Sequence, residues 1–123
     1  MADTIVWADI PVTDMDRARK FYSAVLQADV ALMPEMDDVA LLPGDENGVN
    51  ADLARGENQR PGPGGCTIYF DSKGDPEGMI ARAVAAGGQV AMPVTDMGEM
   101  VGFIGFFIDS EGNRIGVHKP AQG

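Results

Sequence analysis

The chain has 123 residues, a length typical of one compact domain. Its 19 acidic side chains and nine Lys and Arg give a net charge of -10, which repels nucleic acid and anionic membrane surfaces, so we expect neither as a partner. The 45% apolar content is enough to form a hydrophobic core. No apolar stretch approaches the ~20 residues that a membrane-spanning helix needs. A single cysteine cannot form a disulfide within the chain, which fits the reducing cytoplasm.

Residues 5–12 alternate in character and predict the first strand. One face is uniformly small or branched and apolar, as packing beneath a helix requires: Val6, Ala8, Ile10 and Val12. The other face mixes aromatic and polar side chains and includes Trp7 and Asp9. A solvated face would also be polar but seldom carries an indole, so the pattern favours a strand whose second face lines a cleft.

Residues 14–27 predict the first helix. Apolar side chains recur there at the i, i+3, i+4, i+7 spacing of an amphipathic helix, and an aspartate at the start is suited to cap it. Weaker strand patterns follow at residues 29–33 and 39–42. Residues 49–54 alternate clearly and predict another strand, with Asp52 on its polar face.

A connector rich in Gly and Pro, residues 56–65, divides the chain near its middle. After it, residues 65–71 alternate again, with Thr67 and Tyr69 on the mixed face. Residues 76–86 predict the second helix, because a proline stands in its first turn and two glycines follow its end.

Three strand patterns complete the chain, at residues 89–94, 101–109 and 114–118. In the second we assign Phe103 to the cleft face. Residues 101–109 are mostly apolar, however, and without alternation the sequence does not show clearly which side chains face the helices. In the third, His118 lies on the mixed face.

The order is therefore strand, helix and three strands, repeated once. It predicts an α+β fold in which two βαβββ modules, about residues 4–55 and 66–119, form a curved mixed sheet around one cleft with the helices outside. With the connector at residues 56–65, we treat residues 1–123 as a single domain. The helix-facing side chains that we expect to be buried are Val6, Ile10, Phe21, Val25, Leu26, Ile68, Phe70, Ile80, Val84, Ile115 and Val117.

Motifs along the chain resemble a known family. Residues 9–26, DIPVTDMDRARKFYSAVL, resemble the opening of the glyoxalase/bleomycin resistance/extradiol dioxygenase family, the vicinal oxygen chelate superfamily. Residues 109–116, DSEGNRIG, are similar to its closing hairpin, and residues 83–90 to the end of its second helix. One departure is Gln27, where a glycine usually ends the first helix. The resemblance implies this fold and a homodimer, but one scaffold serves many chemistries.

Metal-dependent members of that family hold a divalent ion with four side chains, one from each of four strands on the cleft face. The resemblance places these positions on or near Trp7, Asp52, Gly65 and Gly116. Only Asp52 carries a donor for such an ion, and a lone carboxylate holds it weakly. We therefore expect no metal and no other cofactor, with a divalent metal as the alternative.

The candidate ligand-binding residues are those assigned to the mixed face: Trp7, Asp9, Asp52, Thr67, Tyr69, Phe103 and His118. An indole at a position where the family usually has a metal ligand suits stacking on a flat small molecule, unless it simply plugs the cleft. We expect metal-independent binding of a small apolar or aromatic molecule, similar to the drug-binding branch of the family.

The alternative is an enzyme, namely a lyase, isomerase or dioxygenase that uses a divalent metal or acid–base chemistry. His118 and Asp9 are then the candidate catalytic residues, but a lone histidine is more often structural, so we lean towards a binding protein. A third reading is a structural or regulatory dimer module with a vestigial cleft. Cys66 falls on the apolar face of its strand, so we expect a buried, inert thiol.

Overall fold

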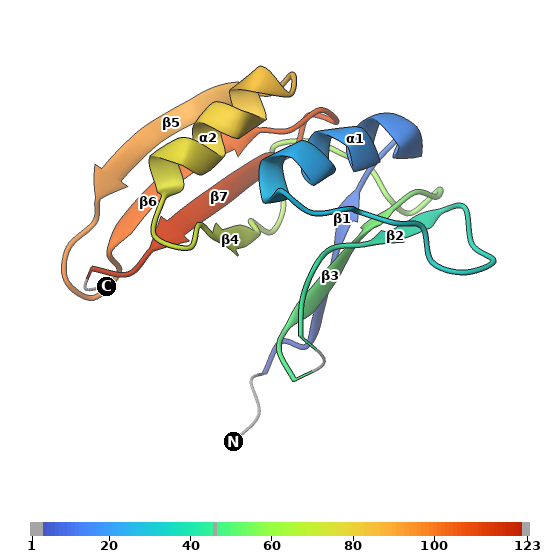
Figure 1. Ribbon diagram of the computed structural model, residues 1–123, viewed down its shortest axis with the longest axis horizontal. Helices are drawn as coiled ribbons and strands as arrows, with labels where there is room; N and C mark the ends of the chain where they lie inside the picture. Colours follow the sequence, from blue (N-terminus) through green and yellow to red (C-terminus); the bar gives the residue numbers. More distant parts are fainter. Residues whose placement is uncertain (1–3, 46, 122–123) are drawn as a thin grey trace.

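The protein, in a computed structural model, is described over residues 4–45 and 47–121, where it has two helices and seven strands (Figure 1). The helices are α1 (Met15–Leu26) and α2 (Pro76–Ala85). The strands are β1 (Trp7–Pro11), β2 (Val39–Leu41), β3 (Asn50–Ala54), β4 (Tyr69–Asp71), β5 (Gln89–Asp96), β6 (Phe103–Ile108) and β7 (Arg114–Lys119). Within this part of the chain, no helix is long and apolar enough to cross a membrane.

The strands form two mixed sheets, in the orders β1–β3–β2 and β4–β7–β6–β5. In each sheet the first and last strands of a module pair in parallel, β1 with β3 and β4 with β7, and the other neighbours are antiparallel. This α+β arrangement confirms the predicted class and is consistent with two modules around a curved sheet. Residues 29–33 differ from the prediction: in place of a strand, they contribute the isolated bridge between Leu32 and Ala40.

Both helices begin where the sequence predicts. The Asp14 carboxylate accepts a hydrogen bond from the backbone N–H of Arg17 at 3.0 Å, and Asp75 caps α2 through the N–H of Gly78 at the same distance. At the end of α1, Gln27 itself adopts the left-handed conformation, with φ of 54°. That backbone favours glycine, which explains the residue usual at this position in the resembling family.

Aromatic side chains join both modules in one core. Phe21 and Tyr22 of α1 meet edge to face, with 5.0 Å between their ring centroids. Phe21 lies 6.0 Å from Phe107 of β6, and Tyr22 lies 5.9 Å from Phe70 of β4. The two helices also pack side by side (Figure 1). A helix of the first module thus buries apolar surface of the second, and the core is continuous between them.

Most of the expected core is confirmed. Six of the eleven side chains are buried: Ile10, Phe21, Val25, Ile80, Ile115 and Val117. Three more pack partly buried against them: Leu26, Ile68 and Phe70. The expectation is wrong for Val6 and Val84, whose exposed fractions are 68% and 44%. Val6 is exposed because it precedes β1, whereas α1 packs over β2 and β3. Val84 is exposed because it lies beside, and not on, the buried face of α2 that contains Ala83.

The facing assigned to β6 is also wrong. Gly105 lies against α2, where an added Cβ would come within 2.7 Å of Ile80 Cδ1, and Phe107 is fully buried. Phe103 shares their face of the strand, so it points towards the helix side and Phe106 towards the other. The apolar run offers no alternation that would fix its facing, and the close approach of β6 to α2 decides it.

Asp109 and Asn113 tie the hairpin between β6 and β7 to the first module. The Tyr22 hydroxyl donates to Asp109 Oδ2 at 2.5 Å, and the Asn113 side-chain amide donates to the same oxygen at 3.0 Å. That amide also donates to the Pro11 carbonyl at 2.8 Å. Gly112 supplies the positive φ that this turn needs, at 94°. The closing hairpin therefore holds the end of β1 beside the start of β7.

Glu111, at the tip of this hairpin, completes the cap of α1. Its buried carboxylate accepts hydrogen bonds from the backbone N–H of Thr13 at 2.8 Å and of Asp14 at 2.9 Å, and from Arg17 Nε at 2.7 Å. Burial alone would raise the pKa of Glu111, but these donors outweigh it and lower the pKa from 4.5 to about 2. The ionised side chain thus joins the start of α1 to the second module.

Candidate functional site

Three side chains meet on the outer face of the first sheet, the face away from the core. We call Trp7, Asp9 and Asp52 the Trp7 cluster. The parallel pairing of β1 with β3 places Asp9 directly opposite Asp52. The Trp7 indole Nε1–H donates to Asp52 Oδ2 at 3.2 Å, while 47% of the Trp7 surface stays exposed. The predicted facing of β1 and β3 is therefore confirmed, because Ile10 and Leu53 point into the core.

Asp52 is an unusual carboxyl group for its place in the sheet. Its exposed fraction is 6%, and its Oδ1 accepts no hydrogen bond from the described residues. Burial raises the pKa of Asp52 from 3.8 to about 6, and the neighbouring Asp9 carboxyl adds to the rise while the Trp7 N–H opposes it. The cluster therefore holds a desolvated acid beside a second carboxyl and a half-exposed indole.

A second group occupies the outer face of the other sheet. We call Tyr69, Phe106, Arg114 and Gly116 the Tyr69 cluster. The Tyr69 and Phe106 rings meet at an angle, with 5.6 Å between centroids, and the Arg114 guanidinium lies 3.6 Å above the Phe106 ring. Tyr69 also covers Gly116, its register partner, so a side chain at residue 116 would collide with the ring. The sequence did not identify Phe106, because the facing of β6 could not be fixed. Arg114 falls on the mixed face of the last predicted strand with His118, but it was not among the candidate residues.

The remaining candidate residues do not join either cluster. Phe103 lies on the helix side of β6, with Lys119 Nζ 5.6 Å from its ring centroid. His118 Nε2 lies 2.6 Å from the Val101 carbonyl, within hydrogen-bond distance at the loop between β5 and β6. Thr67 is half-buried in the segment before β4. His118 and Asp9 therefore belong to different sheets, and no hydrogen bond or ion pair between described residues joins them.

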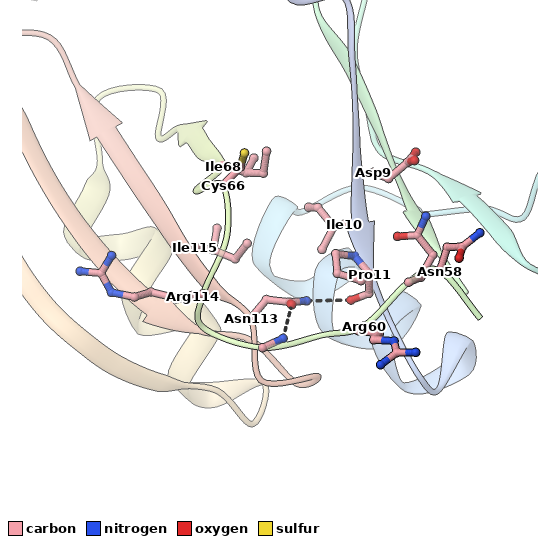
Figure 2. Close-up of a pocket in the computed structure, with 13 residues that line it drawn as sticks. Asp9, Ile10, Pro11, Asn58, Arg60, Cys66, Ile68, Asn113, Arg114 and Ile115 are labelled. Atoms are coloured by element: carbon pink, nitrogen blue, oxygen red, sulfur yellow. Dashed lines mark hydrogen bonds between the residues drawn. The ribbon is translucent and has the colours of Figure 1, made fainter. Parts of the chain in front are cut away.

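A pocket of about 330 Å³ lies between the two sheets (Figure 2). Ile10, Ile68 and Ile115 line it from both modules, and Asn58, Arg60, Cys66 and Asn113 are among its polar walls. In Figure 2 the side chains of Asp9 and Arg114 extend to opposite sides of this space.

The connector between the modules forms one wall of this pocket. The N–H of Gly62 donates to Asn113 Oδ1 at 3.0 Å and so holds the connector against the hairpin (Figure 2). Cys66 is exposed here, and the expectation of a buried thiol is wrong because the regular strand begins only at Tyr69. The sequence identifies this segment only as a connector rich in Gly and Pro, and no local pattern in it indicates that it lines a pocket.

The residues at the four positions that the resemblance assigns to metal ligands do not fit a metal ion. Trp7 uses its only polar atom to donate to Asp52, Gly116 lies beneath a tyrosine ring, and Gly65 has no side chain. In the described ranges, no group of three or more His, Cys, Asp or Glu side chains is placed to hold an ion. Divalent ions bound by protein need more donors than the one carboxyl that remains at these positions.

Comparisons with known proteins agree with this architecture. The model of the Glyoxalase/Bleomycin resistance protein/Dioxygenase superfamily matches residues 4–117. A glyoxalase/bleomycin resistance protein from Albidiferax ferrireducens T118 is 20% identical, with 96% of this chain and 100% of that chain covered and a TM-score of 0.74. A glyoxalase-related enzyme from Fulvimarina pelagi is 16% identical, with 94% and 87% covered and a TM-score of 0.72. At these identities the solved structures establish a shared fold alone. No curated protein matches the chain.

Proposed function

The chain belongs to the glyoxalase/bleomycin resistance protein/dioxygenase superfamily, and on that premise we propose that it binds a small apolar or aromatic molecule beside Trp7 without a metal ion. The observation that carries the proposal is the state of Trp7, whose indole is 47% exposed yet anchored to Asp52 through Nε1. A flat apolar surface held in place in this way can stack on a ligand ring with little further loss of side-chain freedom.

The expected affinity follows from contributions to the binding free energy that are each small. A specific aromatic contact with Trp7 contributes about 1 kcal/mol beyond the burial of apolar surface. Burial of the ligand adds to this, and immobilising the ligand subtracts from it. We therefore expect dissociation constants in the micromolar range.

An enzyme is the second candidate, and one observation favours it. The pKa of Asp52 is raised to about 6 by burial and by Asp9, and acids shifted towards neutrality are frequent in catalytic sites. The acid–base pair considered from the sequence, His118 with Asp9, has weaker support, because the two lie on different sheets and His118 contacts the Val101 carbonyl. A lyase, isomerase or dioxygenase would have to use the Trp7 cluster instead.

We also propose that two copies associate. β1 is an edge strand, and Ile5 and Val6 before it expose 60% and 68% of their surfaces. Asp9 and Arg114 both line the pocket, and their side chains extend to opposite sides of it (Figure 2). A second copy that places its Tyr69 cluster opposite Trp7 would enclose a ligand from both sides.

Light scattering tests this association. It should give twice the 13.0 kDa chain mass at micromolar concentration, and Val6→Lys should lower the measured mass. A monomer mass for the unaltered protein would refute the association.

Elemental analysis of freshly purified protein tests whether ligand binding is independent of a metal ion. We expect less than stoichiometric zinc, nickel, iron and manganese, together with ligand binding that survives dialysis against a chelator. About one metal ion per chain, lost in Asp52→Asn but kept in the matched variant Asp37→Asn, would overturn metal-independent binding and support the enzyme.

We also propose a cytoplasmic location. The chain has a single cysteine, which fits a reducing compartment.

A further inference from the structure

We propose that the Trp7 cluster binds the protonated amine of a cationic ligand, with the ammonium group held by Asp9 and Asp52 and the apolar part of the ligand lying on Trp7. The inference rests on the proposed function and deepens it, because it names the chemical class of the ligand. Three observations on the Trp7 cluster carry it.

The first is a buried acceptor without a donor. Asp52 is 6% exposed, and the Trp7 indole satisfies Oδ2 while Oδ1 accepts nothing from the described residues. A buried carboxylate oxygen that lacks a donor is costly. Its nearest polar partner is the Asp9 carboxyl, which can donate to it only when one of the two groups is protonated. Oδ1 is covered by its neighbours, so a ligand would reach it only after the side chains of the Trp7 cluster shift. An alkylammonium group brings three N–H donors, enough to bond Asp52 and the Asp9 carboxylate together once they have done so.

The second is uncompensated negative charge. The ion pairs among the described residues join Arg17 to Glu111, Arg19 to Asp16 and Arg55 to Asp38, and none includes Asp9 or Asp52. Arg114 and Lys119 instead lie over phenylalanine rings of the other sheet. Asp9 and Asp52 are opposite neighbours in the strand register, so a cation between them would offset the negative charge of both carboxylates.

The third is the neighbouring indole, which selects the kind of cation. Trp7 is half-exposed and offers a ring face to an organic cation or to the aromatic group attached to it. A hard divalent ion would gain nothing from the indole and would find two carboxyls where it needs about six oxygen ligands. The net charge of -10 further favours cationic over anionic ligands during the encounter.

The experiment compares three probes of nearly equal shape, benzylammonium, benzyl alcohol and benzoate. Because the chain has one tryptophan, the NMR signal of its indole N–H reports on the Trp7 cluster without assignment of the rest. We expect benzylammonium to shift this signal with an affinity at least about tenfold above that of benzyl alcohol, and benzoate to have no effect. Asp52→Asn should remove the advantage of the amine, whereas Asp37→Asn, with the same charge change at an exposed residue, should keep it.

The outcomes separate this inference from the proposed function. If benzyl alcohol shifts the Trp7 signal as tightly as benzylammonium, the cation site is wrong while aromatic binding stands. An amine advantage that persists in Asp52→Asn, or an equal response to magnesium chloride alone, would also overturn the inference. If neither aromatic probe affects the signal, both proposals fail. The two-dimensional spectrum of each variant shows whether it has kept its fold.

Discussion

The ring of Tyr69 lies over the Cα of Gly116, in the space that a side chain at residue 116 would occupy. The two residues are direct partners across the parallel strands β4 and β7, and a Cβ at residue 116 would lie 2.7 Å from Tyr69 Cε2. Residue 116 is also the position that the family resemblance assigns to the last metal ligand. The tyrosine ring therefore fills the space in which a metal-binding side chain at residue 116 would have to lie.

Replacing Gly116 tests this packing directly. Gly116→Ala should lower the free energy of unfolding by about 1–3 kcal/mol, because the new methyl group forces the Tyr69 ring aside. Urea denaturation measures the loss. The double variant Tyr69→Ala/Gly116→Ala should show a strong favourable coupling, since the smaller side chain makes room. A Gly116→Ala protein as stable as the original would show that the ring does not rest on residue 116.

Glu111 should make the protein sensitive to acid. Its pKa is about 2 in the folded protein against an ordinary 4.5, so the unfolded chain binds the proton first as the pH falls. The associated stability is fully present above pH 4.5 and is lost between there and about pH 2, amounting to about 3 kcal/mol at 1.4 kcal/mol per unit. Denaturation followed from pH 5 to pH 2 measures it.

The matched variants for this prediction are Glu111→Gln and Glu99→Gln. Glu111→Gln should already be destabilised at pH 5 and should lose less stability on acidification than the original protein. Glu99→Gln, at an exposed residue of the loop between β5 and β6, should behave like the original. Identical acid profiles for all three proteins would contradict the role given to Glu111.

Asp52 should act in the opposite direction. Its folded pKa of about 6 lies above the ordinary 3.8, so the folded protein binds the proton more tightly. The stability from this group is therefore greatest below about pH 3.8 and falls by up to about 3 kcal/mol as the pH rises through 6. Asp52→Asn should be more stable than the original at pH 8 and should lack this slope. Trp7 fluorescence should titrate near pH 6 in the original only, and a flat signal would contradict the shift.

The sequence was informative where side chains alternate. In β1 and β3 the apolar and polar faces differ clearly, so the sequence assigns Ile10 to the core and Trp7 and Asp52 to the other face, as the structure has them. In β6 the run FIGFFI is apolar on both faces, and only contact with α2 decides that Gly105 points inward.

The candidate site depends on relations that are not local in the sequence. Asp9 and Asp52 were each named as ligand-binding residues, but their direct pairing follows from the parallel register of strands that are 43 residues apart. The burial of Asp52 likewise depends on tertiary packing around the middle strand of its sheet. Tyr69 was assigned to the outer face, whereas its contact with Phe106 required the facing of β6. The individual residues of the candidate site could thus be predicted from the sequence, but which of them lie together could not.

The central claim, metal-independent binding beside Trp7, is tested most directly by the affinity of one aromatic ligand, selected by screening, for the chelator-treated protein and for Trp7→Ala. Calorimetry should give a micromolar dissociation constant for the original protein and one at least about tenfold weaker for Trp7→Ala, a loss of about 1.4 kcal/mol. Trp7→Phe should recover part of it, because a smaller ring still stacks. Equal affinity in the original and Trp7→Ala, or binding that appears only after a divalent metal is added back, would contradict the claim.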